Sequence, residues 1–311
     1  MISTESEKGT LARGLASIDK NSLSWHGPVN ATLHGVSTSW YLPSIEVKVQ
    51  LESYLNNLSL AEPRDKTRAA EPLSIYWYPH DLAGVTSEEI WESDADPDCR
   101  ISGSIDQEIA IQRDFIAAME NSNVVRFISP LRIGDGFHNF LRWLLPRKML
   151  ERNCALIHSS AIRTASGKAH LFLGPSGAGK TTLSSFAPIA DVLGDDMNVL
   201  AMENGVFSVV GGVFGQKLQN QKLIGRAFPI GSVCWLKQGP SVAVRRLTRS
   251  EAYLDILSCF ANLFWERLDG QAILKVQSLV TKLVEHVPTF EIEFNLQGEV
   301  WNNVIQRIEE H

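Results

Sequence analysis

In the first part of the chain, apolar residues occur in short runs separated by polar segments that contain proline. Runs of about four to eight residues rich in β-branched and aromatic side chains are typical of strands. Four strands are predicted, at residues 44–51, 73–78, 100–105 and 123–128. Residues 1–24 are polar and mixed, and residues 61–72 are charged with two prolines, so both segments are predicted to be exposed and irregular.

In the second part, helical and strand-like spacings of apolar residues are interleaved. Helices are predicted at residues 137–153, 250–265 (capped by Ser250) and 271–286, with a short helix from residue 299. The predicted strands are residues 155–162, 168–173, 198–202, 206–210, 232–237, 241–247 and 289–294. Successive strands are expected to form hairpins across residues 163–167, Asn204-Gly205 and residues 238–240.

Aromatic residues crowd the first part of the chain. A ligand-stacking surface is one interpretation, but aromatic side chains on short strands are usually buried, so a core role is favoured. The residues concerned are Trp25, Trp40, Tyr76, Trp77, Tyr78 and Trp91. His80 and Asp81 follow one of these strands and are interpreted as surface loop residues.

The segment after the predicted strand 168–173 carries the most specific pattern. Gly174-Pro-Ser-Gly-Ala-Gly-Lys180-Thr181 fits every fixed position of the phosphate-loop motif GxxxxGK[ST]. Glycines let successive N–H groups face one anion, the lysine reaches the β- and γ-phosphates, and the threonine hydroxyl binds Mg²⁺. The competing interpretation is a glycine-rich turn before a helix. We predict a site for ATP and Mg²⁺, with Mn²⁺ as an alternative metal, formed by Gly174, Pro175, Ser176, Gly177, Ala178, Gly179, Lys180, Thr181 and Thr182.

Two adjacent aspartates end the next apolar segment, residues 189–193. From this position a carboxylate of Asp195 or Asp196 can meet the metal of a bound nucleotide. Neighbouring strand residues point to opposite faces, so both carboxylates reach one site only at a strand end or turn, which Gly194 permits. The competing interpretation is a pair of solvated aspartates.

Composition narrows the class of protein. The chain has 311 residues, 44% of them hydrophobic, which is enough for one large or two medium domains. Its net charge of −6 argues against a nucleic-acid partner. Without a long apolar run or a leader-like start, the chain is expected to be cytoplasmic with no membrane partner. The four cysteines are far apart and are expected to be reduced thiols.

Four blocks of residues resemble the nucleotide-binding core shared by ATP-dependent phosphoenolpyruvate carboxykinase and HPr kinase/phosphorylase. They are His158-Ser159-Ser160-Ala161, the phosphate loop with its TTLS segment, Gly194-Asp195-Asp196 and Gly211-Gly212. The resemblance implies an α/β protein with a C-terminal carboxykinase-like mixed-sheet nucleotide-binding domain. The short predicted strands before it indicate a smaller strand-rich α+β domain at the N-terminal side. Because proline and glycine accumulate near residues 130–136, residues 1–132 are assigned to substrate or partner recognition and residues 133–311 to a P-loop kinase domain.

The resemblance also implies roles for single residues. Lys180 and Thr181 would hold phosphate and metal, Asp196 would contact the metal, and Asp195 would be the general base. His158 would lie near metal and phosphate, its alternative being an ordinary buried strand histidine. The candidates for an arginine that stabilises the transferring group are Arg226, Arg245, Arg246 and Arg249.

Two departures from the carboxykinase pattern bear on the reaction. Val210 stands where the carboxykinase has an acidic residue, and Gln216, followed by Lys217, replaces its lysine. Decarboxylation is therefore not expected. The expected function is an ATP- and Mg²⁺-dependent kinase that phosphorylates a hydroxyl, with serine favoured, in a peptide, a carrier protein or a free amino acid. The alternatives are a nucleotide-binding regulatory switch without transfer and a carboxykinase or phosphorylase; homo-oligomerisation is left open.

Overall fold

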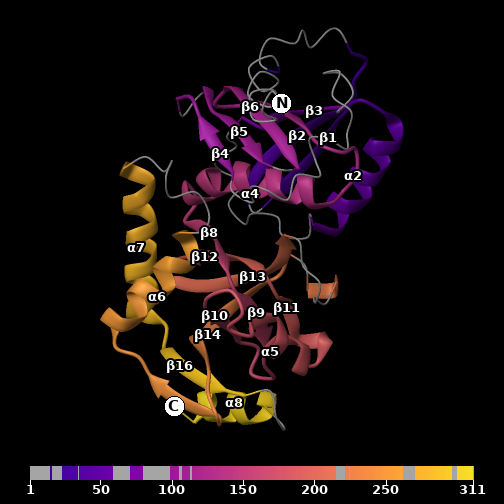
Figure 1. Ribbon diagram of the computed structural model, residues 1–311. Helices are drawn as coiled ribbons and strands as arrows, with labels where there is room; N and C mark the ends of the chain where they lie inside the picture. Colours follow the sequence, from indigo (N-terminus) through magenta and orange to yellow (C-terminus); the bar gives the residue numbers. More distant parts are fainter. Residues whose placement is uncertain are drawn as a thin grey trace, which may run out of the picture. The chain divides into compact units, whose positions relative to one another are not determined.

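The computed structural model describes residues 15, 23–33, 35–58, 71–79, 99–104, 107–112, 114–214, 221–223, 225–261, 270–295 and 300–310. The chain divides into two compact units, Met1–Leu145 and Pro146–His311, whose elements are labelled in Figure 1. The division falls inside helix α4 (Asp135–Leu150), at its internal Pro146, whereas the sequence analysis placed a domain boundary before this helix. Both units are α/β and contain mixed sheets.

The first unit is built on a seven-stranded sheet with the order β1-β2-β3-β7-β6-β5-β4. Strands β2, β3 and β7 are parallel, and the other neighbours are antiparallel. The strands are β1 (His26–Leu33), β2 (Val36–Leu42), β3 (Leu73–Tyr78), β4 (Arg100–Ser102), β5 (Ile109–Gln112), β6 (Phe115–Asn121) and β7 (Val124–Ile128). Strands β1, β2, β5 and β6 were not predicted, because polar and small residues interrupt their apolar pattern.

An aromatic cluster forms the core of this unit. Trp40 and Trp77 are fully buried, and the Phe127 and Phe140 rings stack with their centroids 3.8 Å apart. The predicted core role is therefore confirmed for Trp40 and Trp77, and also for Tyr78, which is fully buried. Trp25 and Tyr76 are only half-buried and meet edge to face, and Trp91 lies outside the described residues.

The strand predicted at residues 44–51 is wrong: this segment is the first half of helix α2 (Ile45–Leu58). Its alternating apolar residues imitate a strand, but the buried ones are Val47, Leu51 and Leu55, spaced four apart as on one face of a helix. Ile45 and Val49 are exposed. The Ser44 hydroxyl accepts the Val47 N–H at 3.3 Å, a capping contact that starts the helix.

The second unit contains a nine-stranded sheet that curls back on itself. Its main path has the order β11-β9-β10-β14-β13-β12-β8, and β16 joins β14 on one side and β15 on the other. Only Ser159 separates β8 from β9, and only Asp195 and Asp196 separate β11 from β12. The strands at the two ends of the path, β11 and β8, are therefore each continued by a strand from the opposite part of the sheet. The strands are β8 (Cys154–His158), β9 (Ser160–Arg163), β10 (Ala169–Leu173), β11 (Val192–Gly194), β12 (Met197–Glu203), β13 (Val206–Phe214), β14 (Ala227–Gln238), β15 (Ala243–Arg246) and β16 (Thr289–Phe294).

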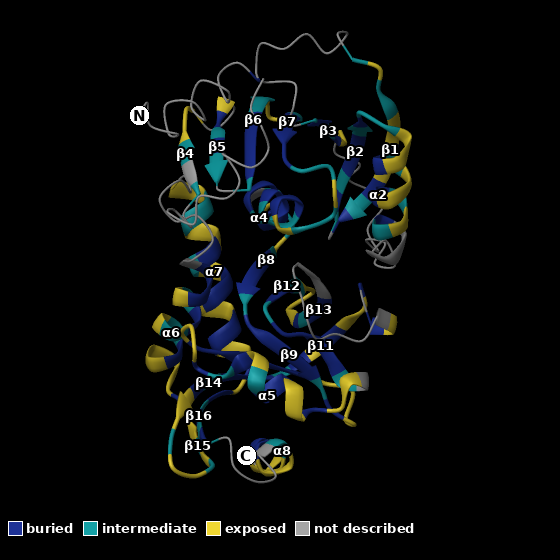
Figure 2. Cartoon of the chain, turned by 45° about the vertical axis from the view of Figure 1, so that its right-hand side comes forward, coloured by how far each residue is buried: buried dark blue, intermediate teal, exposed yellow. Residues whose placement is uncertain are grey.

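Helices cover both faces of the sheet around β10, which is buried along its whole length. The neighbouring strand β9 is drawn mostly in the dark blue of buried residues (Figure 2). Leu171 and Leu173 pack in the cluster that includes residues of α6 (Arg249–Ala261) and α7 (Gly270–His286). Phe172 points the other way, into the cluster with α5 (Lys180–Phe186) and α8 (Val300–Glu309). The alternation of side chains along one strand thus fixes β10 between two helical layers, and the loop after it begins from a rigid position.

Two of the three predicted hairpins are confirmed. β9 and β10 are antiparallel, and β12 and β13 pair across Asn204-Gly205, where both residues have positive φ as a two-residue hairpin turn requires. The third is wrong, because β16 lies between β14 and β15, parallel to the former and antiparallel to the latter.

None of the described helices has the length and apolar composition needed to cross a membrane. All four cysteines are free thiols, as expected.

Candidate functional site

The phosphate-loop motif forms a tight loop between β10 and α5. Gly174, Gly177 and Gly179 have φ values of 151°, 79° and 101°. A Cβ on Gly174 would lie 2.8 Å from the Ala178 Cβ, and a Cβ on Gly179 would lie 2.8 Å from the Phe294 ring. A Cβ on Gly177 would have no atom within 4 Å, so only the positive φ favours glycine at this position. The loop is therefore a cradle that larger residues would fill or distort.

Lys180 is folded back across this loop. Its Nζ donates to the carbonyl oxygens of Gly174 at 2.8 Å and of Pro175 at 3.1 Å, and the residue is only 7% exposed. Burial lowers the pKa of Lys180, while the neighbouring Cys259 and Asp196 act in the opposite direction. The ammonium group is therefore held over the concave backbone where the motif predicts phosphate.

Thr181 connects the loop to the two aspartates. It is exposed in the first turn of α5, and its hydroxyl donates to the Asp195 carbonyl oxygen at 3.2 Å. Thr182 follows it in the same turn, half-buried. Asp195 and Asp196 lie at the junction of β11 and β12, the kind of strand end that lets neighbouring carboxylates approach one site.

The two aspartates differ in their surroundings. Asp195 is 2% exposed, whereas the Asp196 side chain is 37% exposed and lies 3.3 Å from His158 Nε2 through its Oδ1. The N–H of Ser159, the residue after His158, donates to the Asp196 carbonyl oxygen at 2.9 Å. The predicted site residues of the loop, the aspartate pair and the strand histidine therefore converge on one region of the second unit.

The donor set at this region fits a small hard cation. A threonine hydroxyl and carboxylate oxygens are ligands that Mg²⁺ accepts, and Mg²⁺ usually completes its shell with water and substrate phosphates. Among the described residues, no group of three or more His, Cys, Asp or Glu side chains is preassembled to hold a metal ion. A Mg²⁺ ion at this region would share its ligands among the protein, water and the phosphates of a nucleotide.

The sequence analysis did not identify Asn198, Gln238 or Cys259 as neighbours of the site. Asn198 is fully buried behind the junction of the strands, and Gln238, at the end of β14, donates to the Gly177 carbonyl oxygen at 3.0 Å. Cys259 lies on α6 against the Gly174 N–H, and burial raises the pKa of its thiol. A buried amide in an otherwise apolar strand is a signal for Asn198; the other two become neighbours only through the sheet topology.

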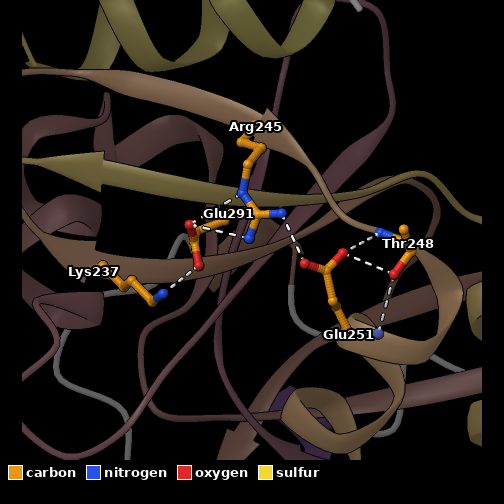
Figure 3. A network of polar contacts seen from close by, with 5 residues as sticks. All are labelled: Lys237, Arg245, Thr248, Glu251 and Glu291. Carbon is orange, nitrogen blue, oxygen red and sulfur yellow. Dashed lines mark hydrogen bonds and ion pairs between the residues drawn. The ribbon is translucent and has the colours of Figure 1, made fainter.

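The candidate arginines have separate environments. Arg226 packs against the Phe228 ring, 5.7 Å from its centroid, and Arg246 and Arg249 are exposed. Arg245 belongs to a network on β14, β15, β16 and α6 (Figure 3), in which it contacts Glu251 at 2.8 Å and Glu291 at 3.3 Å. Lys237 also pairs with Glu291. Arg245 is therefore already committed to carboxylates of its own unit.

The same network corrects the predicted start of α6. The helix begins at Arg249 and is capped by Thr248, not Ser250. Glu251 accepts the Thr248 N–H at 2.8 Å, and the Thr248 hydroxyl faces the Glu251 N–H at 3.4 Å, the reciprocal contacts of a capping box (Figure 3). Arg245 and Thr248 together lower the pKa of Glu251 to about 2.

Several expected positions lie outside the described residues. They are the loop residues His80 and Asp81, and the Gln216-Lys217 pair that departs from the carboxykinase pattern. Gly211 is described: it lies in β13, and its N–H donates to the Arg226 carbonyl oxygen at 3.1 Å.

Comparison with known proteins gives two matches. The model of a family described as SynChlorMet cassette protein ScmC matches residues 141–309, more than half of the chain. Phosphoenolpyruvate carboxykinase (ATP) of Rhizobium rhizogenes (strain K84) is 39% identical over 79 residues. That match spans 25% of the chain and only 14% of the relative, so most of the carboxykinase lies outside the match. The similarity suggests nucleotide binding, and the resemblance to HPr kinase stays a prediction.

Proposed function

The chain belongs to the SynChlorMet cassette protein ScmC family, and we propose that it is an ATP- and Mg²⁺-dependent kinase that phosphorylates a hydroxyl group. The favoured acceptor is a serine hydroxyl, in a peptide, a carrier protein or a free amino acid. The observation that carries the proposal is the convergence of Lys180, Thr181 and the Asp195-Asp196 pair on one glycine-lined cradle.

ATP would supply the phosphoryl group, and Mg²⁺ would neutralise charge on its oxygens. The protein's own contribution is to bind and orient the reactants. Backbone N–H groups of the loop would face the phosphates, apart from Pro175, which has none, and Ala178, which donates to the Pro175 carbonyl oxygen at 3.1 Å. Lys180 carries the positive charge that follows the phosphates. Thr181 and Asp196 would hold the metal, and His158 orients Asp196 through their 3.3 Å contact.

Asp195 is the proposed general base. It would accept the proton of the acceptor hydroxyl, a contribution worth about 10²- to 10⁴-fold in rate. Its low exposure requires the acceptor to reach a carboxylate at the floor of the site, which favours a slender group such as a serine side chain. The division of labour between the aspartates rests on this difference in exposure.

Replacement of single side chains tests the assignment. With γ-labelled ATP, Mg²⁺ and free serine or seryl peptides as acceptors, the wild-type chain is expected to give acceptor-dependent labelling. Asp195→Asn should abolish transfer while Mg²⁺-dependent binding of a fluorescent ATP analogue persists, and Asp196→Asn should weaken the metal dependence of binding. Lys180→Ala should weaken nucleotide binding itself.

The outcomes separate the competing functions. Absence of Mg²⁺-dependent affinity for any nucleoside triphosphate would overturn the proposal. Tight nucleotide binding without transfer to any hydroxyl acceptor would replace it with a regulatory switch. Formation of phosphoenolpyruvate from oxaloacetate and ATP would replace it with a carboxykinase. Transfer that survives Asp195→Asn would remove the base assignment alone.

A further inference from the structure

Asn198 occupies an unusual position for an amide side chain. It lies in β12 two residues after Asp196, is fully buried, and its neighbours along the strand, Met197 and Val199, are apolar and buried. Its Nδ2 donates to the Ser159 carbonyl oxygen at 2.7 Å and to the Ser159 hydroxyl at 3.1 Å. One side chain therefore makes both of its donated bonds to a single residue.

Ser159 is the residue at which two strand ladders are interrupted. The β8–β12 pairing ends at His158 and Met197, and the β9–β11 pairing resumes at Ala161 and Gly194. Ser159 is fully buried in this gap, opposite the aspartate pair, and its N–H donates to the Asp196 carbonyl oxygen at 2.9 Å. Asn198 thus fixes a residue that ties the strand carrying the histidine to the turn carrying the metal-site carboxylate.

Stability does not explain why an amide, with its second polar atom Oδ1, is kept at position 198. Asn198 Oδ1 is buried and has no hydrogen-bond partner among the residues that the structure describes. The amide cannot be turned over, because the Ser159 carbonyl oxygen only accepts and needs the Nδ2 atom. A buried unpaired acceptor costs free energy, so an apolar residue would suit this strand better if stability were its only role.

We propose that Asn198 is a positioning residue that acts through Ser159 to set the distance between His158 and Asp196 for the metal of the bound nucleotide. The inference rests on the proposed function. Loss of the brace is expected to leave the fold of the phosphate loop in place, because the loop is anchored between β10 and α5 and meets the aspartate junction through the Thr181 hydroxyl alone among the contacts described above. It lets the junction of β11 and β12 shift against the end of β8, and so weakens the metal site selectively.

The test compares Asn198→Leu with Ser232→Ala as a matched control. Leucine is close in size to asparagine and removes both the donor and the unpaired acceptor. Ser232 is also buried, on β14, and its hydroxyl bonds His170 rather than any site residue. The measurements are direct Mn²⁺ binding by electron paramagnetic resonance, the Mg²⁺ concentration that half-saturates binding of a fluorescent ATP analogue, and binding of the same analogue in EDTA.

Asn198→Leu is expected to raise the half-saturating Mg²⁺ concentration and the Mn²⁺ dissociation constant by about 10- to 100-fold, as for other supporting residues of metal sites. Metal-free binding of the analogue should change less than about twofold. Ser232→Ala should leave all three values at the wild-type level. If Asn198→Leu does not fold, Ser159→Ala should raise both metal constants by a smaller factor of about three. This variant removes the hydroxyl that accepts from Asn198 and donates to the Ile157 carbonyl oxygen at 3.4 Å, and it keeps the stronger bond from Asn198 to the Ser159 carbonyl oxygen.

Unchanged metal binding in the Asn198→Leu chain overturns the inference and leaves the proposed function intact. If Asn198→Leu does not fold, unchanged metal binding in the Ser159→Ala chain has the same meaning. An equal loss in Ser232→Ala also overturns it, since the effect would then follow general destabilisation. Failure of the wild-type chain to bind nucleotide with Mg²⁺ overturns the proposed function and this inference together.

Discussion

Gly179→Ala is the substitution for which the structure gives the most direct magnitude. Gly179 has φ of 101°, in the region that residues with a Cβ rarely adopt, and the added methyl would lie 2.8 Å from the Phe294 ring. Phe294 is 2% exposed and is packed among residues of α5 and α8, so its ring cannot turn aside into solvent. The alanine therefore meets two separate costs.

The positive φ costs about 1–2 kcal/mol for a residue with a Cβ. The forced contact with a buried ring adds about 1–3 kcal/mol, as overpacking of a core usually does. Gly179→Ala is therefore expected to lower the free energy of opening of the segment by about 2–5 kcal/mol. Gly177→Ala is the control, because its φ of 79° carries the first cost and the space around it is open.

The assay is native-state hydrogen exchange of peptides that cover β10 and α5, because two compact units need not unfold together and a global transition would mix them. Phe294→Leu in combination with Gly179→Ala should recover the part of the loss that comes from the ring, and only that part. If Gly179→Ala and Gly177→Ala lower protection equally, within about 0.5 kcal/mol, the ring contact contributes nothing and the reasoning fails.

Three further predictions concern the parts around the site. His170 is 4% exposed, and burial lowers its pKa to about 4. Between about pH 6.5 and pH 4 the unfolded chain binds a proton at this histidine and the folded chain does not, so the second unit should lose up to about 3 kcal/mol of stability as the pH falls through this range. His170→Gln should flatten this pH dependence in urea titrations at several pH values. Thr248→Ala removes the cap of α6 and should cost about 1 kcal/mol, seen as faster exchange in the first turn of that helix and not in α7. In the first unit, Trp143→Phe removes the Nε1 donor that lies 2.7 Å from the buried Glu108 carboxylate. The free energy of unfolding, measured with denaturant, should fall by about 2 kcal/mol. A fall of less than about 0.5 kcal/mol would mean that this hydrogen bond adds nothing to stability.

The second unit was the more predictable one because its signals are local. The helices at residues 250–265 and 271–286 correspond to α6 and α7, and residues 168–173 and 289–294 to β10 and β16. The loop motif fixes its own conformation through glycines, so its cradle could be anticipated without knowledge of the sheet. The strand end at Gly194 could be anticipated because two adjacent carboxylates can reach one site only from a strand end or turn, and the structure ends β11 at Gly194.

What escaped prediction depends on partners far away in the chain. The run 155–162 reads as one strand, and only the pairing of its two halves with β12 and β11 divides it at Ser159. The alternation in residues 44–51 favours a strand until the four-residue spacing of Val47, Leu51 and Leu55 is continued beyond it. Likewise, sequence proximity favoured a β14–β15 hairpin, but β16 supplies a better partner to both strands.

The insertion of β16 between β14 and β15 has a consequence for biosynthesis. Phe294, at the end of β16, forms the wall beneath Gly179, although it follows that glycine by more than a hundred residues. While the ribosome is still translating α7, the nascent phosphate loop lacks the Phe294 ring and β14 lacks one of its neighbouring strands, β16. The phosphate loop of the growing polypeptide therefore reaches its folded packing late in synthesis, after β16 has emerged and docked.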